Sequence, residues 1–319
     1  MFGKKKRAGK TVAIADIENG SVAAALVRLA PGEAPRLFAE KRVLLPLSRT
    51  HNPALLARQT EKALEEALAH ISEVSSRMRL HETLGTEGEV AHIAGFFSVP
   101  WASIELAGTP TFMPHMRDTL RSAARATLGE QKLSLHPYGA AALHGALSFF
   151  PDEGPALICI VSGEATELLL VADNSLKARA TLPLGLHTLL RTLISHGGMS
   201  PEEARSYLSL EGRGASGHPA PEPLRHAAAH FAEEFADVAK PLLRVAPAQS
   251  VFVLAPQLSE TWFARALGDN DSLSELFQDG ASVRAVRTGH AQPFMGGHGA
   301  RPDLPLMLEA LFVDKSRYA

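Results

Sequence analysis

The segment Asp16-Ile17-Glu18-Asn19-Gly20-Ser21-Val22 joins two strongly apolar runs, 11–17 and 21–29, near the start of this 319-residue chain. Asn and Gly favour tight turns, whereas the β-branched and aliphatic residues on either side favour strands. A third strand-like run, 36–44, follows a Pro-Gly-Glu turn at 31–33. The chain is therefore predicted to open with a three-stranded antiparallel meander.

Helical and strand patterns alternate after this meander. Asn52 and Pro53 suit the start of a helix, and apolar residues then recur at helical spacing up to Ile71. The other elements predicted before residue 150 are a strand at 89–97, a helix at 115–128, a strand at 132–135 and a helix at 138–149. The turn-forming segment Pro151-Asp152-Glu153-Gly154 is the best candidate for a domain boundary.

A second meander is predicted after this boundary, and helices follow it as they follow the first. The predicted strands are 156–161, 165–172, 176–182, 250–254 and 281–287, and the predicted helices are 186–195, 201–210, 223–245, 259–267 and 304–313. Because each sheet has to cover both of its faces, two similar lobes flanking a central cleft are the simplest arrangement. We therefore predict an α/β protein with a basic tail at 1–10, a first lobe at 11–150 and a second lobe at 151–319.

Composition argues against several classes of protein. The 32 Lys and Arg residues nearly balance the 34 Asp and Glu residues, which argues against a nucleic-acid-binding protein with a broad basic face. The single cysteine, Cys159, lies in an aliphatic run, which predicts a buried, reduced thiol and no disulfide framework. The histidine spacing matches no metal site, and no apolar run reaches the roughly 20 residues of a membrane-spanning helix. These features predict a cytoplasmic protein.

A cluster of positive charge lies near the start of the chain, at Lys4, Lys5, Lys6 and Arg7. A solvated, disordered tail is the simpler interpretation. The alternative is contact with anionic lipid headgroups, to which each cation contributes about 1 kcal/mol. That alternative places the protein at the inner face of the membrane.

The hairpin around Asn19 and Gly20 has the residue types of a phosphate site. Backbone N–H groups and small hydroxyls in such a turn can face a phosphate, while an aspartate at the end of the preceding strand holds a hydrated Mg²⁺. A plain structural turn is the commoner origin of such a segment. A second hairpin, within 160–170, opens the second meander in the same way, and the pair is more specific than either hairpin alone.

Together, the two hairpins resemble those of the actin-like superfamily, whose lobes are ribonuclease-H-like, and within it the bacterial branch of the cell-division protein FtsA and the pilus assembly protein PilM. Asp16 with Gly20-Ser21-Val22 is similar to the first phosphate motif. Gly163-Glu164-Ala165-Thr166-Glu167 is similar to the second, and Leu182-Pro183-Leu184-Gly185 is similar to the segment after it. The resemblance covers most of the chain, but the segment 78–131 aligns loosely and is interpreted as an inserted subdomain.

This resemblance implies a weak, vestigial nucleotide site made of Asp16, Asn19, Gly20, Ser21, Gly163, Glu164 and Thr166. Three motifs depart from the family pattern. Glu18 stands where the family has glycine, Ile160 stands where it has aspartate, and Ala255-Pro256-Gln257 stands where it has glycines. A carboxylate repels phosphates, and loss of a metal-positioning group typically costs one to two orders of magnitude in affinity or activity. We therefore expect ATP with Mg²⁺ to bind weakly or not at all and expect no resident metal, while the sequence leaves any catalytic residue unidentified.

The favoured hypothesis is a catalytically weak or inactive cytoplasmic scaffold of a membrane-associated machine for type IV pilus assembly, secretion or cell division. The resemblance implies that its partner is the cytoplasmic peptide of a membrane protein, and self-association is a further expectation. The first alternative is an active, filament-forming ATPase in which Glu18, Glu164 or Glu167 replaces the missing aspartate. The second is a small-molecule kinase of the same superfamily, for which the segment 160–163 offers no substrate-activating aspartate.

Overall fold

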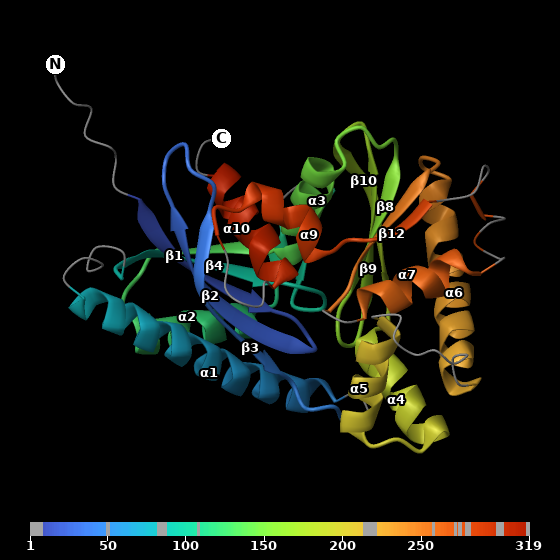
Figure 1. Cartoon of the computed structure of the whole chain (residues 1–319), viewed down its shortest axis with the longest axis horizontal. Coiled ribbons are helices and arrows are strands. Elements are labelled where there is room, and N and C mark those ends of the chain that lie inside the picture. Colours follow the sequence, from blue (N-terminus) through green and yellow to red (C-terminus); the bar gives the residue numbers. More distant parts are fainter. Residues whose placement is uncertain are drawn as a thin grey trace.

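The computed structural model describes residues 9–48, 52–81, 88–106, 109–212, 222–256, 259–270, 273, 276–277, 282–297 and 303–316. The basic cluster from Lys4 to Arg7 lies outside the described residues. Within them, two five-stranded sheets stand side by side and form the centres of two lobes (Figure 1). This arrangement confirms the predicted α/β fold with two lobes.

The first sheet consists of the opening meander and two later strands. β1 (Lys10–Ile17) pairs antiparallel with β2 (Ser21–Leu29), which pairs antiparallel with β3 (Arg36–Leu44). On the other side of β1, β4 (Val90–Phe97) and β7 (Leu133–Pro137) continue the sheet in parallel, in the order β3-β2-β1-β4-β7. All residues of β1 after Lys10 are buried, because helices cover both faces of the sheet. This burial explains why the strand is an unbroken apolar run rather than an alternating one.

The second sheet repeats this topology. β8 (Ala156–Val161), β9 (Thr166–Ala172) and β10 (Ser175–Leu182) form its antiparallel meander. β11 (Ser250–Leu254) and β12 (Ser282–Ala285) then add to β8 in parallel, in the order β10-β9-β8-β11-β12. Both sheets therefore carry their first hairpin at the same position relative to the parallel strands.

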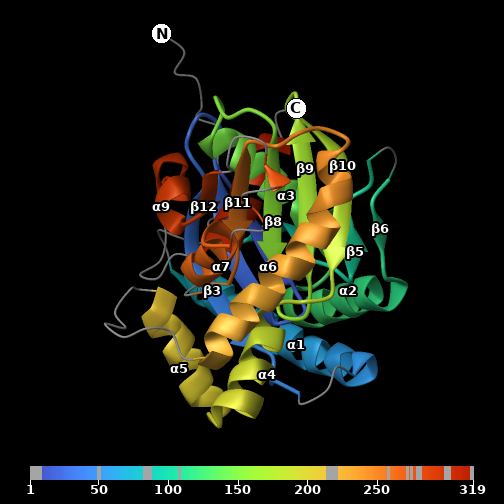
Figure 2. The same cartoon turned by 90° about the vertical axis from the view of Figure 1, so that its right-hand side faces the viewer.

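Helices cover the outer face of each sheet. α1 (Pro53–Leu80) and α2 (Pro114–Leu128) pack on the first sheet, and Asn52 caps α1 by accepting a hydrogen bond from the backbone N–H of Leu55 at 3.1 Å. α4 (Leu186–Gly197), α6 (Glu222–Leu243) and α7 (Glu260–Gly268) pack on the second sheet, with α5 (Pro201–Gly212) against α4 and α7 (Figure 2). No helix in the described part of the chain is both long and apolar enough to cross a membrane.

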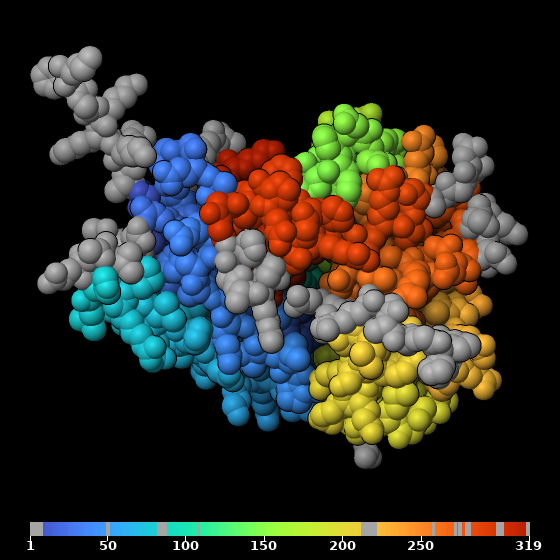
Figure 3. Space-filling view, in the orientation of Figure 1, coloured from blue at the N-terminus to red at the C-terminus, as the bar shows by residue number. Residues whose placement is uncertain are grey.

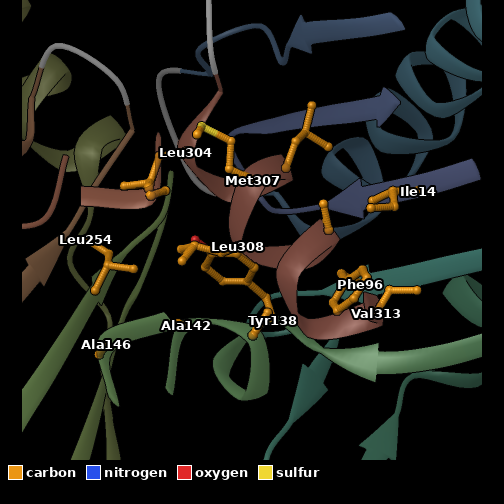
Figure 4. Close-up of a cluster of buried hydrophobic side chains, with 14 of the residues drawn as sticks. Ile14, Phe96, Tyr138, Ala142, Ala146, Leu254, Leu304, Met307, Leu308 and Val313 are labelled. Atoms are coloured by element: carbon orange, nitrogen blue, oxygen red, sulfur yellow. The ribbon is translucent and has the colours of Figure 1, made fainter. Parts of the chain in front are cut away.

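The inner faces of the two sheets share one helical layer. It contains α3 (Tyr138–Phe149), α9 (Thr288–Ala291), the 3₁₀ turn η1 (Gln292–Phe294) and α10 (Leu304–Ser316). α10 is apolar on all sides, and Met307 and Leu308 are completely buried. Figure 4 shows these side chains between Ile14 of the first sheet and Leu254 of the second. A helix that is apolar all round is typical of such a fully enclosed position.

Two parts of the domain prediction differ from the observed packing. The segment 78–131 was expected to form an inserted subdomain, but β4 lies inside the first sheet beside β1, and α2 packs on α1. Within the described part of this segment, the short hairpin of β5 (Ala102–Ser103) and β6 (Thr111–Phe112) is what forms a separate sheet. The segment 304–316 was grouped with the second lobe, whereas α10 contacts α3, β1 and β2. The apolar side chains of α10 are fully covered because the first sheet packs against one side of this helix.

Candidate functional site

The two hairpins that the sequence singled out meet across the lobes. Gly20, between β1 and β2, packs backbone against backbone with Gly163, between β8 and β9. A Cβ added to Gly163 would lie 2.5 Å from the Cα of Gly20, and one added to Gly20 would lie 2.8 Å from the Cα of Gly163. Only glycine permits this approach. A phosphate chain running between the two hairpins therefore has no room at this point.

Asn19 joins the two lobes by hydrogen bonds. Its side chain is completely buried, and its Nδ2 donates to the carbonyl oxygen of Val99 at 2.9 Å. Its Oδ1 accepts from the backbone N–H of Glu164 in the second hairpin at 2.8 Å. That N–H group is the kind of donor that a phosphate would need. The protein therefore uses one of its own side chains where a nucleotide would otherwise bridge the lobes.

Arg42 of β3 occupies the position of a cation beside Asp16. Its Nη2 donates to Asp16 Oδ2 at 2.7 Å, and its Nη1 donates to Ser21 Oγ at 2.6 Å. Arg42 also forms a two-pronged ion pair with Asp303, with N–O distances of 2.6 and 2.9 Å, and it lies 3.4 Å from Glu18. Ser21 donates a further hydrogen bond to Glu18. Since a guanidinium group cannot be deprotonated in a protein, it is a permanent counter-charge for these carboxylates.

The strand register explains how Arg42 reaches Asp16. Asp16 of β1 lies opposite Ala23 of β2, and Ala23 lies opposite Arg42 of β3. The small side chain of Ala23 leaves a path across which the guanidinium extends to Asp16. A register shift between Leu26 and Val27 of β2 sets this alignment, because a one-residue slip moves a side chain to the other face of a sheet.

Glu309 of α10 adds a second buried carboxyl to this cluster. It is completely buried, and neither of its oxygens meets a donor among the described residues when it is ionised. Burial raises its pKa, and the charge of Asp16 raises that pKa further, which favours the uncharged form of this carboxyl group. Burial also raises the pKa of Glu18 to about 7, although Arg42 opposes the shift. Arg42 thus supplies positive charge to these carboxylates from within the protein.

Glu164 and Thr166 of the second hairpin are used within the second lobe. Glu164 accepts two hydrogen bonds from Arg191, at 2.7 and 3.0 Å, and lies 3.0 Å from Nδ1 of His187. Although burial acts to raise it, these hydrogen bonds and charges lower the pKa of Glu164 to about 2. The hydroxyl of Thr166 donates to the carbonyl oxygen of Leu184 at 2.7 Å. Both side chains therefore point into the lobe and not into the cleft.

The structure brings five of the seven predicted site residues to the junction of the hairpins. Asp16, Gly20, Ser21 and Gly163 line a cavity there, and Asn19 lies directly behind it. Sequence reasoning missed three residues of the same cluster, which come from distant parts of the chain: Arg42, Asp303 and Glu309. A charged residue inside a predicted strand was the one available signal for Arg42.

A cavity of about 390 Å³ lies between the lobes beside this junction. Its walls come from both lobes, and many of them are apolar: Tyr138, Ile160, Leu186, Leu190, Leu208, Leu254, Pro256 and Leu304. Figure 3 shows the surfaces of β3 (blue) and α5 (yellow) meeting below those of α9 and α10 (red). Ala255 and Pro256, which stand where the family has glycines, form part of the wall.

The residues present do not fit a magnesium nucleotide. Arg42 already holds Asp16, the hairpins touch at Gly20 and Gly163, and Asn19 already pairs with the backbone N–H of Glu164. Within the described ranges, no group of three or more His, Cys, Asp or Glu side chains is arranged to hold a metal ion. Binding in the usual manner would require the breaking of these contacts.

The two lobes of the same topology, the position of their hairpins and the cleft between them define an actin-like fold. Among solved structures, the chain is similar to that of a "PilM-PilN type IV pilus biogenesis complex", at 14% identity and a TM-score of 0.58, covering 95% of this chain and 97% of that one. It is also similar to the ethanolamine utilization protein EutJ from Carboxydothermus hydrogenoformans, at 16% identity and a TM-score of 0.54, covering 94% and 89%. No family model and no curated protein sequence matches the chain. These similarities confirm the predicted actin-like, PilM-like fold.

Replacing Asn19 with Ala tests the hydrogen bonds between the lobes. Because the backbone N–H of Glu164 loses its acceptor, we expect its hydrogen exchange to accelerate by about tenfold or more. Gln131→Ala is the matched control, because that side-chain amide bonds to Leu128 within the first lobe. Exchange at Glu164 that is equally slow in both variants would contradict this role of Asn19.

Replacing Glu164 with Gln tests the electrostatics of the second hairpin. The pKa of Glu164 lies at about 2 in the folded protein, below its ordinary value of 4.5. The ionised carboxylate therefore stabilises the fold above about pH 4.5, and this stabilisation is lost as the pH falls towards 2. We expect the wild-type protein to exceed the variant in free energy of unfolding at pH 7, with a difference that shrinks below pH 4.5. Urea denaturation at a series of pH values measures it, and a constant difference would show that the charge is irrelevant.

Proposed function

We propose that this protein is an actin-like scaffold that does not hydrolyse nucleotides and that holds part of a membrane-associated machine on the cytoplasmic side. The observation that carries the proposal is the Arg42 side chain, which binds Asp16, Ser21 and Asp303 where the fold would place a cation and phosphates. Catalysis of phosphoryl transfer depends on positioning and on electrostatic stabilisation of phosphate charge. Both requirements are missing while Arg42 and the hairpins occupy this space.

The proposed partner is the cytoplasmic peptide of a membrane protein. Support comes from the similarity in fold to PilM in a complex with PilN, over nearly the full length of both chains. Pilus assembly is therefore the favoured machine, with secretion and cell division as its alternatives. Because fold alone does not establish function, the proposal depends on direct binding measurements.

Titration calorimetry with ATP, with and without Mg²⁺, tests the first half of the proposal. We expect no saturable heat at micromolar ATP and no phosphate release by the wild-type protein. Asp16→Ala should leave this baseline unchanged, because Asp16 is already held by Arg42. If the wild-type protein bound Mg-ATP at micromolar affinity and Asp16→Ala abolished turnover, it would be an active ATPase instead.

Fluorescence polarisation with labelled peptides tests the second half. The panel consists of synthetic peptides that copy the cytoplasmic ends of membrane proteins from the organism that makes this protein. Each peptide has a scrambled control of the same composition. We expect at least one peptide to bind saturably while its scrambled control does not, and we expect ATP to leave the affinity unchanged. A full panel without sequence-dependent binding would contradict the scaffold role.

A further inference from the structure

The cavity between the lobes has a composition unlike that of a phosphate site. Leucine side chains from five different elements line it: Leu44 of β3, Leu186 and Leu190 of α4, Leu208 of α5, Leu254 of β11 and Leu304 of α10. Its volume of about 390 Å³ falls within the range of about 300–1,000 Å³ typical of pockets for small molecules. An apolar body of modest size is therefore complementary to these walls.

Some charged side chains in the cavity wall form ion pairs with described residues, and others do not. The carboxylates of Asp16, Glu18 and Asp303 all pair with the single guanidinium group of Arg42. Arg205 of α5 is half-buried in the same wall and forms no hydrogen bond or ion pair with any described residue. A guanidinium group that is partly removed from water without a partner favours an anionic ligand.

A second guanidinium group lies in this wall. Arg287, an exposed residue that precedes α9, donates a hydrogen bond from its guanidinium group to the neutral hydroxyl of Thr261 at 3.0 Å and forms no ion pair with a described residue. Glu260 of α7 also lines the cavity and is the one carboxylate there that has no ion pair among the described residues. Outside the Arg42 cluster, the wall therefore holds two guanidinium groups without an ion pair among the described residues against one such carboxylate.

We propose that the cavity binds a small amphiphilic anion, with its apolar body against the leucines and its single acidic group at Arg205. A carboxylate or sulfonate meets both requirements, whereas a triphosphate would bring several negative charges towards Asp16, Glu18 and Asp303. This site makes use of the cleft without the phosphate contacts that Asn19 and Arg42 have replaced. It does not depend on the identity of the peptide partner.

Fluorescence of anilinonaphthalene sulfonate, an apolar molecule with one anionic group, tests the site on the full chain. We expect saturable binding, and we expect dodecanoate to displace the dye at a concentration at least tenfold lower than dodecyltrimethylammonium, which has the same chain and the opposite charge. Arg205→Ala should weaken dodecanoate binding by about tenfold. The matched control is Arg225→Ala, an exposed arginine on α6, and it should leave the affinity unchanged.

A second variant blocks the cavity without removing a charge. Ser209 lines the wall from a half-buried position on α5, and Ser209→Trp should abolish dye binding while the urea denaturation midpoint stays within the wild-type range. Equal potency of the two amphiphiles, equal effects of Arg205→Ala and Arg225→Ala, or no saturable dye signal would each overturn this inference and leave the scaffold proposal intact. Displacement of the dye by micromolar Mg-ATP would instead overturn both.

Discussion

The two sheets are held in one fixed relation because they pack on the same helical layer. α10 is apolar on every side, and it is enclosed by α3 and by residues of both sheets, so neither lobe can move away without exposing it. Since the two sheets have the same topology, this shared layer brings equivalent hairpins to the same place. The contact between Gly20 and Gly163 is the result, and Asn19 and the Arg42 cluster have formed around it.

The cleft shows how a fold can persist while its usual chemistry is lost. Asn19 accepts a hydrogen bond from the backbone N–H of Glu164, a donor that could serve a nucleotide. Arg42 pairs with Asp16, a carboxylate that could hold a cation. Burial of a polar group is costly unless the group is paired. The contacts of Asn19 and Arg42 therefore stabilise the arrangement of the two lobes that a bound ligand would otherwise stabilise. The walls of the remaining cavity are largely apolar, and Arg205 in these walls pairs with no described residue. The cavity therefore differs in its chemistry from a phosphate-binding site.

Most of the secondary structure could be predicted from local pattern, because turn residues bounded apolar runs at nearly every strand. The position of Arg42 could not. An extra residue in β3, Phe38, shifts the register near Leu26, and an unshifted hairpin would place Lys41 opposite Ala23 instead. The electrostatic interaction of Glu309 with Asp16 was equally hidden, since the two residues approach only through tertiary packing. The segment 78–131 was misjudged because parallel pairing of β4 with β1 leaves no local signal.

The place of α10 also has a consequence for synthesis on the ribosome. The inner face of the first sheet, which includes Ile14 and Phe96, is complete long before residues 304–316 are made. Until then this apolar surface has no permanent cover, and such surfaces are prone to aggregation. The first lobe therefore lacks this part of its core until the segment 304–316 has been synthesised and has packed on it.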